Sequence, residues 1–185
     1  MKGVLGITGT PGTGKKSVAP LAAKLLGVES FSIGELALAH GCARPMGGEY
    51  EVDTERLRRK LPALVPRPSV LHGHLLPAVL DPSLAERVVV LRCEPRTLGE
   101  RLRSRRYPEP KVRANLEAEL IGVVAAEAHD VFGSATVELD TTSAAPPKAA
   151  AAVARLTEGK ASARRIDWTR SYGSAPKLRS LFPAG

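Results

Sequence analysis

The strongest constraint on this sequence is the segment GTPGTGK at residues 9–15, which matches the pattern G-x-x-x-x-G-K. An apolar run at residues 3–8 precedes it, and apolar residues recur after it at helical spacing (Val18, Leu21, Ala22, Leu25 and Leu26). The segment is therefore predicted to be a loop between a strand and a helix. The backbone N–H groups of such a loop wrap a chain of phosphates, beside the positive end of the helix dipole. Nucleotide binding is predicted, with contacts from Gly9, Gly12, Thr13, Gly14 and Lys15.

Position 16 departs from this pattern, which places a Ser or Thr there to hold Mg²⁺. The chain has Lys16 instead, followed by Ser17. Ser17 is turned about 100° around the helix from residue 16, so it is a weak candidate for a metal ligand and a candidate for contact with the α-phosphate. Two interpretations of Lys16 stay open: an exposed cation on the helix surface, or an ammonium group that replaces part of the Mg²⁺ charge between phosphates.

The rest of the chain alternates between apolar runs of strand length and segments with helical periodicity. Further buried strands are predicted at residues 70–72, 88–91 and 136–139, a strand end with a helix at 31–40, and helices at 53–64, 97–106, 108–131 and 149–156. The Gly- and Pro-rich residues 41–51 are expected to form a mobile excursion, and the residues from Ser162 onward a loosely held tail. This alternation predicts the α/β class, as a three-layer αβα sandwich around a five-stranded parallel sheet.

The formal net charge of +8 is concentrated in two regions. Residues 92–113 and residues 159–185 each carry a net charge of +5, which leaves the remaining residues close to neutral. Because basic clusters attract anions, nucleotide, RNA and acidic lipid are all compatible with the composition. The charge alone therefore does not choose among these partners.

No apolar run approaches the roughly 18 residues that a membrane span needs, so no membrane partner is expected. The apolar start at residues 1–8 runs into the glycine-rich loop and is predicted to be a strand instead of a signal peptide. Cys42 and Cys93 lie far apart, without a C-x-x-C motif or a His cluster, which argues against a disulfide framework and a zinc site. A reducing cytoplasmic location fits this cysteine usage.

Several motifs occur in a characteristic order along residues 3–168. They are the loop at 9–15, Val52-Asp53-x-x-Arg56-Leu57, Gly73-His74-Leu75, Arg101-Leu102-x-x-Arg105-x-Tyr107, Asn115-x-x-Ala118-Glu119, Asp140-Thr141-Thr142 and Ile166-Asp167-Trp168. With this order and spacing the chain resembles the adenylate kinase isoenzyme 6 family, also called coilin-interacting nuclear ATPase, and in particular its archaeal-type members.

The resemblance implies a small nucleoside monophosphate kinase fold at residues 1–168 with a basic C-terminal tail at 169–185. It places a monophosphate-binding segment at about 32–53 and a short lid at about 104–114. Members of that family transfer a phosphoryl group from ATP to AMP or to water, and they assist maturation of the small ribosomal subunit. The family usually has Gly where this chain has Arg106, so the hinge of the lid is expected to be stiffer here.

Site residues follow from the same resemblance. The expected catalytic residues are Lys15, His74, Arg101 and Arg105; Lys16, Ser17, Arg105 and Thr142 would contact ATP; and Gly34, Glu35, Asp53 and Arg56 would lie on the AMP side. The lid arginines can also be understood directly, since guanidinium groups on a mobile segment can neutralise a transferring phosphoryl group. Asp53 is equally well explained as a helix N-cap, and Arg56 as a surface cation.

A second departure lies at the third predicted strand, where the family has an acidic residue, Gly and His. This chain has His72-Gly73-His74. His72 therefore stands where the family has the acidic residue that helps to hold Mg²⁺. Lys16 and His72 together remove metal ligands and add positive charge, which makes an intact Mg²⁺ site doubtful.

Two functions are therefore weighed for the chain. The first is an adenylate kinase-like enzyme with ATPase activity, which uses ATP and AMP. The alternative is a nucleotide-gated maturation factor for the small ribosomal subunit, with weak or no kinase activity, whose basic tail contacts rRNA or a ribosomal protein. Kinases of small metabolites such as shikimate share the loop and the lid, and only the resemblance argues against that third class.

Overall fold

The computed structural model describes residues 1–46, 49–157 and 165–182 of the chain. Its centre is a sheet with the strand order β2-β5-β1-β6-β7, in which all neighbouring strands are parallel. The strands are β1 (Val4–Thr8), β2 (Glu29–Ser32), β5 (Ser69–His72), β6 (Ala85–Arg92) and β7 (Thr136–Asp140). The predicted five-stranded parallel sheet is confirmed.

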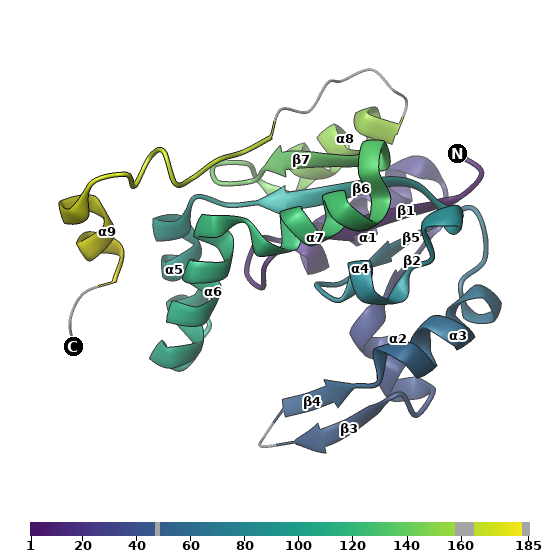
Figure 1. Cartoon of the computed structure of the whole chain (residues 1–185). Helices are drawn as coiled ribbons and strands as arrows, with labels where there is room; N and C mark the ends of the chain where they lie inside the picture. The colour runs from purple at the N-terminus through teal and green to yellow at the C-terminus, as the bar shows by residue number, and fades with distance from the viewer. Residues whose placement is uncertain (47–48, 158–164, 183–185) are drawn as a thin grey trace.

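Helices cover both faces of this sheet (Figure 1). One apolar layer holds α1 (Lys15–Leu26) and α8 (Pro146–Thr157); the other holds α2 (Ile33–Ala39), α3 (Thr54–Leu64), α4 (Leu76–Val79) and α7 (Val123–Phe132). In β6, Val89 and Leu91 enter the first layer, whereas Val88 and Val90 enter the second. Because side chains alternate along a strand, a continuous apolar run is buried on both faces, and the three-layer αβα arrangement follows.

The single helix predicted at residues 108–131 is wrong. The structure has α6 (Glu109–Ile121) and α7 (Val123–Phe132), which meet at Gly122. Gly122 has a φ of 72°, in the left-handed region that favours glycine, and it ends α6 while it begins α7. The chain turns there, so that α7 packs on the sheet while α6 pairs with α5 (Pro95–Ser104).

Residues 41–51, expected to form a mobile excursion, contribute to a hairpin. Strands β3 (Ala43–Met46) and β4 (Glu49–Val52) pair antiparallel, with Arg44 opposite Glu51. The sequence separates the two extended segments by Gly47 and Gly48, which is a hairpin signal.

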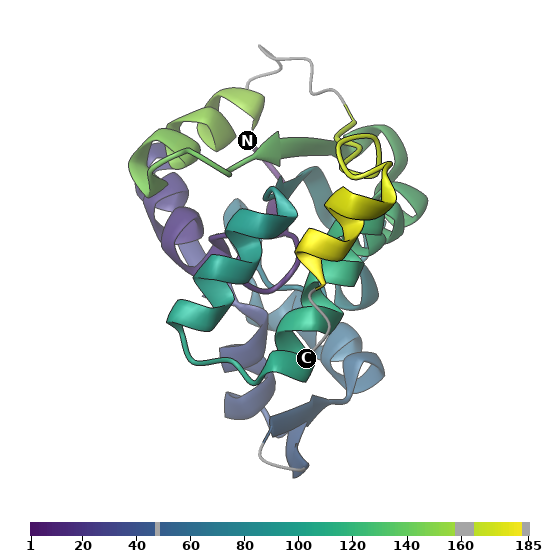
Figure 2. The same cartoon turned by 90° about the vertical axis from the view of Figure 1, so that its left-hand side faces the viewer.

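The expectation of a loosely held tail is wrong for residues 165–182, which pack on α5 and α6. Tyr172 and Leu181 are buried in a cluster with Leu98, Leu102 and Leu116. The C-terminal segment ends in α9 (Ala175–Leu181), which lies next to α5 and α6 (Figures 1 and 2). The other tail residues, 158–164 and 183–185, lie outside the described residues, and the domain division at residue 168 stays a prediction.

Two short 3-10 helices, at Pro82–Leu84 and Gly133–Ala135, precede β6 and β7. Within the described residues, no helix has both the length and the apolar character needed to cross a membrane. Cys42 and Cys93 are both buried free thiols.

Candidate nucleotide site

The loop at residues 9–15 joins the carboxyl end of β1 to the start of α1, as predicted. Its glycines adopt backbone conformations that other residues rarely take, with φ values of 136° at Gly9 and 97° at Gly12. A Cβ atom on Gly9 would lie 2.3 Å from the carbonyl oxygen of Leu91, and one on Gly12 would lie 2.6 Å from Leu98. The close approach of the loop to β6 and α5 therefore requires glycine at both positions.

Lys15 is buried at the centre of the loop, with 9% of its surface exposed. Its Nζ donates hydrogen bonds to the carbonyl oxygens of Gly9 and Thr10. Burial lowers the pKa of Lys15 to about 7; the Glu119 carboxylate opposes this shift and Arg105 adds to it. Since a bound phosphate would stabilise the ammonium form, the site favours an anionic ligand near this group.

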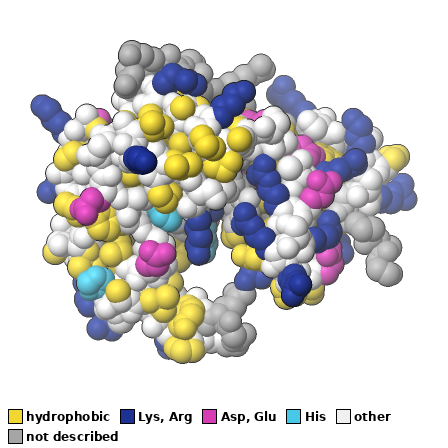
Figure 3. Space-filling model, turned by 180° about the vertical axis from the view of Figure 1, so that it is seen from behind, with side chains coloured by type: hydrophobic (Ala, Val, Ile, Leu, Met, Phe, Trp, Pro, Cys, Tyr) yellow, Lys and Arg dark blue, Asp and Glu magenta, His cyan; other side chains and the backbone are white. Residues whose placement is uncertain are grey.

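A pocket of about 500 Å³ opens beside the loop. Its lining residues are Pro11, Gly12, Gly14, Lys15, Lys16, Ser17, His74, Arg105, Tyr107, Lys111 and Asn115. These residues supply cations from α1, from the end of α5 and from α6, and none of the described lining residues is a carboxylate. Figure 3 shows a hollow on this side of the molecule with Lys and Arg side chains along its walls. The pocket suits a chain of phosphates.

A smaller pocket of about 220 Å³ adjoins it. The two pockets share Gly12, Gly14, Ser17 and Arg105, and the smaller one adds Arg101, Thr141 and apolar residues of the region that leads into α8. Its position next to the phosphate pocket suits the base of a nucleotide, where apolar contacts and backbone groups bind an aromatic ring.

The two arginines that were expected to act together both line the smaller pocket, but they have different partners. Arg105 is exposed and lines both of these pockets. Arg101 donates hydrogen bonds to the carbonyl oxygens of Thr141 and Thr142, at 2.9 and 2.7 Å. Arg101 therefore holds the loop after β7, while Thr142 uses its hydroxyl oxygen to accept from the backbone N–H of Glu94.

A third pocket of about 340 Å³ lies toward the hairpin and shares Lys15, Lys16 and His74 with the phosphate pocket. It contains Gly34 and Glu35, as expected for the acceptor side, together with apolar residues from α2 and the hairpin. Tyr50, exposed on β4, also lines it. Tyr50 and Lys111 were not singled out from the sequence, and Tyr107 was noted only as part of a motif, because their place in the site depends on how the hairpin and α6 pack.

Asp53 and Arg56 lie elsewhere. They line a different pocket of about 370 Å³ beside the hairpin, together with Arg44 and Glu51. The Asp53 carboxylate accepts a hydrogen bond of 2.9 Å from the backbone N–H of Arg56, so it is the N-cap of α3. The structure therefore does not bring these two residues together with Gly34 and Glu35.

His72 and His74 stand at the carboxyl end of β5, which faces the loop. His72 is buried, and this burial lowers its pKa; Lys15 and Lys16 lower it further, while Glu35 opposes the shift. The pKa of His74 is lowered by desolvation from the surrounding protein and by the charges of Lys15 and Lys111. The lowered pKa of each imidazole favours its neutral form.

Mg²⁺ prefers oxygen ligands, and at two positions of this edge of the sheet the chain carries nitrogen groups instead. The exposed Lys16 and the buried His72 stand where the loop pattern and the resemblance place a hydroxyl and a carboxylate. Within the described part of the chain, no group of three His, Cys, Asp or Glu side chains is placed to hold a metal ion. Ser17 is exposed and lines the phosphate pocket, but no carboxylate joins it there among the described lining residues.

Comparison with known proteins agrees with this geometry. The sequence model of the AAA domain family matches residues 5–122. A protein named "Putative adenylate kinase" from Pyrococcus abyssi is 38% identical over 180 residues, which cover 95% of this chain and 97% of the relative. A protein of the same name from Archaeoglobus fulgidus is 37% identical over 172 residues, 89% of this chain and 91% of the relative.

Solved structures share the fold at low sequence identity. A shikimate kinase from Acinetobacter baumannii in complex with shikimate has a TM-score of 0.61 at 20% identity, over 85% of this chain and 93% of that one. A gluconokinase from Sinorhizobium meliloti has a TM-score of 0.54 at 20% identity, over 85% and 94%. These two structures support a P-loop kinase fold. The sequence relatives show that the chain belongs to the family of the archaeal proteins named "Putative adenylate kinase".

Proposed function

We propose that the protein is an adenylate kinase-type phosphotransferase, which transfers the γ-phosphoryl group of ATP to AMP or to water. The observation that supports this proposal is the overlap of the pockets. Lys15, Lys16 and His74 line both the phosphate pocket and the acceptor-side pocket. A phosphoryl group that moves between two such pockets remains beside the same cations throughout the transfer.

The chain's own residues would act mainly by charge and by positioning. Lys15, Arg105 and Lys111 surround the phosphate pocket and would stabilise negative charge on the transferring group. Arg101 would act indirectly, because it holds the loop of Thr141 and Thr142 beside the base pocket. The neutral His74 would orient a water molecule at the shared boundary when ATP is hydrolysed.

The proposal includes weakened dependence on Mg²⁺. His72 stands in place of a carboxylate and Lys16 in place of a hydroxyl group. Lys16 lines the phosphate pocket. A cation at this place can neutralise part of the phosphate charge that Mg²⁺ neutralises in other P-loop enzymes.

The test follows ADP formation from ATP with and without AMP, and with and without Mg²⁺. The native chain is compared with the double variant Lys16→Thr with His72→Asp, which restores the oxygen ligands. The double variant should gain Mg²⁺ dependence that the native chain lacks. Lys24→Thr, which removes an exposed lysine from the far end of α1, is the matched control. Fast native turnover that strictly requires Mg²⁺ would contradict the weakened metal site, and no AMP-dependent ADP formation under any condition would contradict the kinase.

A second candidate is a nucleotide-gated maturation factor for the small ribosomal subunit, acting in the cytoplasm on rRNA and a ribosomal protein. It is favoured by the basic residues 159–185, since none of the described residues in this range lines the phosphate, base or acceptor-side pocket. Because residues 165–182 pack on α5 and α6, deletion of this segment would disturb the fold. The double variant Lys177→Ala with Arg179→Ala, on the exposed surface of α9, therefore tests the basic charge more directly. Unchanged affinity for small-subunit rRNA and an unchanged salt slope in this variant would remove α9 from that function.

A further inference from the structure

Glu119 is a buried carboxylate near the end of α6, with 1% of its surface exposed. Its Oε2 accepts a hydrogen bond of 2.5 Å from the hydroxyl group of Thr10 in the phosphate-binding loop. This bond joins residues that are 109 positions apart in the sequence. Helix α6 is therefore tied directly to the phosphate-binding loop.

The other oxygen of the same carboxylate collects three donors. Oε1 accepts from Nε of Arg92 at 2.9 Å, from the backbone N–H of Cys93 at 2.9 Å and from Nε1 of Trp168 at 3.2 Å. Arg92 and Cys93 lie at the end of β6, whereas Trp168 belongs to the C-terminal segment, residues 165–182. One carboxylate thus holds the loop, the sheet and the C-terminal segment together.

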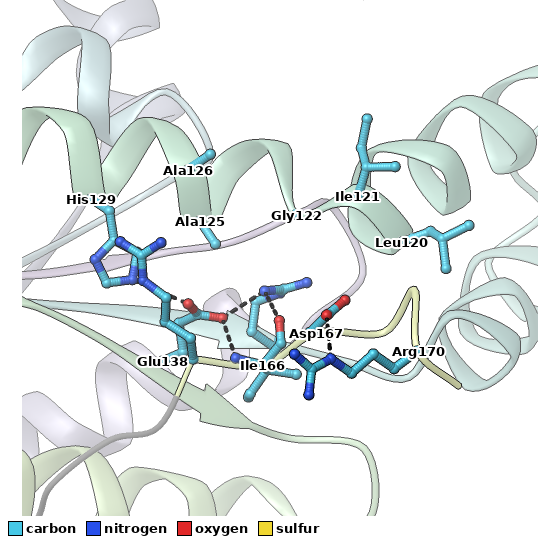
Figure 4. Close-up of a pocket in the computed structure, with 12 residues that line it drawn as sticks. Leu120, Ile121, Gly122, Ala125, Ala126, His129, Glu138, Ile166, Asp167 and Arg170 are labelled. Carbon is cyan, nitrogen blue, oxygen red and sulfur yellow. Dashed lines mark hydrogen bonds and ion pairs between the residues drawn. The ribbon is translucent and has the colours of Figure 1, made fainter. Parts of the chain in front are cut away.

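Arg92 provides a second connection between the sheet and the C-terminal segment. It is fully buried, and its Nη1 donates to Glu138 at 2.6 Å and to the carbonyl oxygen of Ile166 at 3.1 Å. The backbone N–H of Ile166 donates in turn to Glu138 at 3.2 Å. Figure 4 shows Glu138 between His129 and the backbone of Ile166, with these contacts marked.

Thr10 carries the connection onward to the phosphate-binding lysine. Its carbonyl oxygen accepts from Nζ of Lys15 at 3.0 Å and from the backbone N–H and hydroxyl of Thr13, while its side chain donates to Glu119. Any shift of Thr10 therefore moves an acceptor of the Lys15 ammonium group. Glu119 also acts on Lys15 through its charge, which raises the pKa of Lys15 against the effect of burial.

We propose that Glu119 is a positioning residue that couples phosphate binding at the loop to the docking of the C-terminal segment through Thr10 and Trp168. The proposal rests on the nucleotide binding of the proposed function and goes beyond it, because it assigns the C-terminal segment a role at the nucleotide site. A buried carboxylate needs all of its donors, since none of them can be replaced by water without rearrangement. A ligand that changes the Thr10 contact must then change the contact made by Trp168.

Trp168 makes this coupling measurable, because it is the chain's single tryptophan. In the native chain, ADP should change the emission of Trp168 and do so with the same half-saturation as ADP binding measured by calorimetry. This measurement needs no variant. ADP binding that leaves the emission of Trp168 unchanged would overturn the coupling while leaving the proposed nucleotide binding intact.

A double-mutant cycle on ADP affinity separates coupling from a merely structural role. Thr10→Val removes the hydroxyl donor at nearly constant volume, and Trp168→Phe removes the indole donor. Each single variant should lose several-fold in affinity, and the double variant should lose less than the product of the two, by roughly threefold or more. Thr10→Ser, which keeps the hydroxyl, should restore both the affinity and the fluorescence response.

Thr136→Val is the matched control, because Thr136 is also a buried threonine whose hydroxyl donates to a protein oxygen, the carbonyl of Ala128 at 2.8 Å. It should combine multiplicatively with Trp168→Phe. Multiplicative losses for Thr10→Val and Trp168→Phe would overturn the proposal. If the native chain does not bind ADP at all, both this proposal and the proposed function fail.

Discussion

The Nζ of Lys15 lies 3.0 Å from the carbonyl oxygen of Thr10, so the cation that faces the phosphate pocket is held by its own loop. Burial lowers the pKa of this ammonium group to about 7, and a bound phosphate would raise it again. The protonation of Lys15 is therefore linked to nucleotide binding.

At pH 8 the free protein would hold Lys15 mostly neutral, whereas the complex would hold it charged. ADP binding at this pH should be accompanied by the uptake of at most about one proton. The affinity for ADP should fall between pH 8 and 9 by at most about tenfold. Calorimetry in buffers of different ionisation enthalpy measures the uptake. Lys15→Met should abolish it and Lys24→Met should keep it. An affinity that is independent of pH in this range, without proton uptake, would contradict the linkage.

Arg101 and Arg105 should give different kinetic defects. Arg105 lines the phosphate pocket, so Arg105→Met should lower kcat by roughly 10²-fold with a smaller change in the KM for ATP. Arg101 binds the carbonyl oxygens of Thr141 and Thr142, so Arg101→Met should mainly raise the KM for ATP. Steady-state kinetics of ADP formation distinguishes the two. Equal losses in kcat for both variants would assign Arg101 to the reacting phosphates.

The contrast between these two arginines shows what the sequence could predict and why it stops there. The strand, the glycine-rich loop and the helix that carry Lys15 are encoded locally, by apolar spacing and by glycines with φ values above +90° at 9, 12 and 14. The parallel sheet follows from the same alternation of strands and helices. The two arginines, in contrast, are four residues apart in a segment with one helical periodicity. Only the packing of α5 against the loop that follows β7 gives them different partners.

The errors have similar causes. The single helix expected at residues 108–131 passed through Gly122 without a break, whereas the left-handed backbone of Gly122 divides α6 from α7. Glu119 was noted only as part of a motif, because its four hydrogen-bond donors come from residues 10, 92, 93 and 168. Long-range contacts of this kind leave no periodic signal in the sequence.

Arg106 is the one residue other than glycine with a positive φ in the described part of the chain, at 59°. It follows α5 at the start of the segment expected to act as a lid. Left-handed backbone costs an L-residue about 1–2 kcal/mol, and part of this cost is regained when glycine takes its place. Arg106→Gly should therefore raise the free energy of unfolding by about 0.5–1 kcal/mol in urea titrations, whereas Arg106→Ala should not. A loss of stability in Arg106→Gly would show that the arginine side chain contributes more than its backbone costs.

The buried pairs of Arg92 predict the largest single loss of stability. Arg92 is 2% exposed and lies between Glu119 and Glu138, with contacts of 2.9 and 2.6 Å. Arg92→Met keeps much of the side-chain volume but leaves two buried carboxylates without their cation, which should cost about 3–5 kcal/mol of unfolding free energy. Arg44→Met provides the control, because the Arg44–Glu51 pair is exposed on the hairpin and should contribute at most about 1 kcal/mol. Urea unfolding followed by circular dichroism measures both variants. Equal small losses would mean that Glu119 and Glu138 find other partners when the arginine is removed.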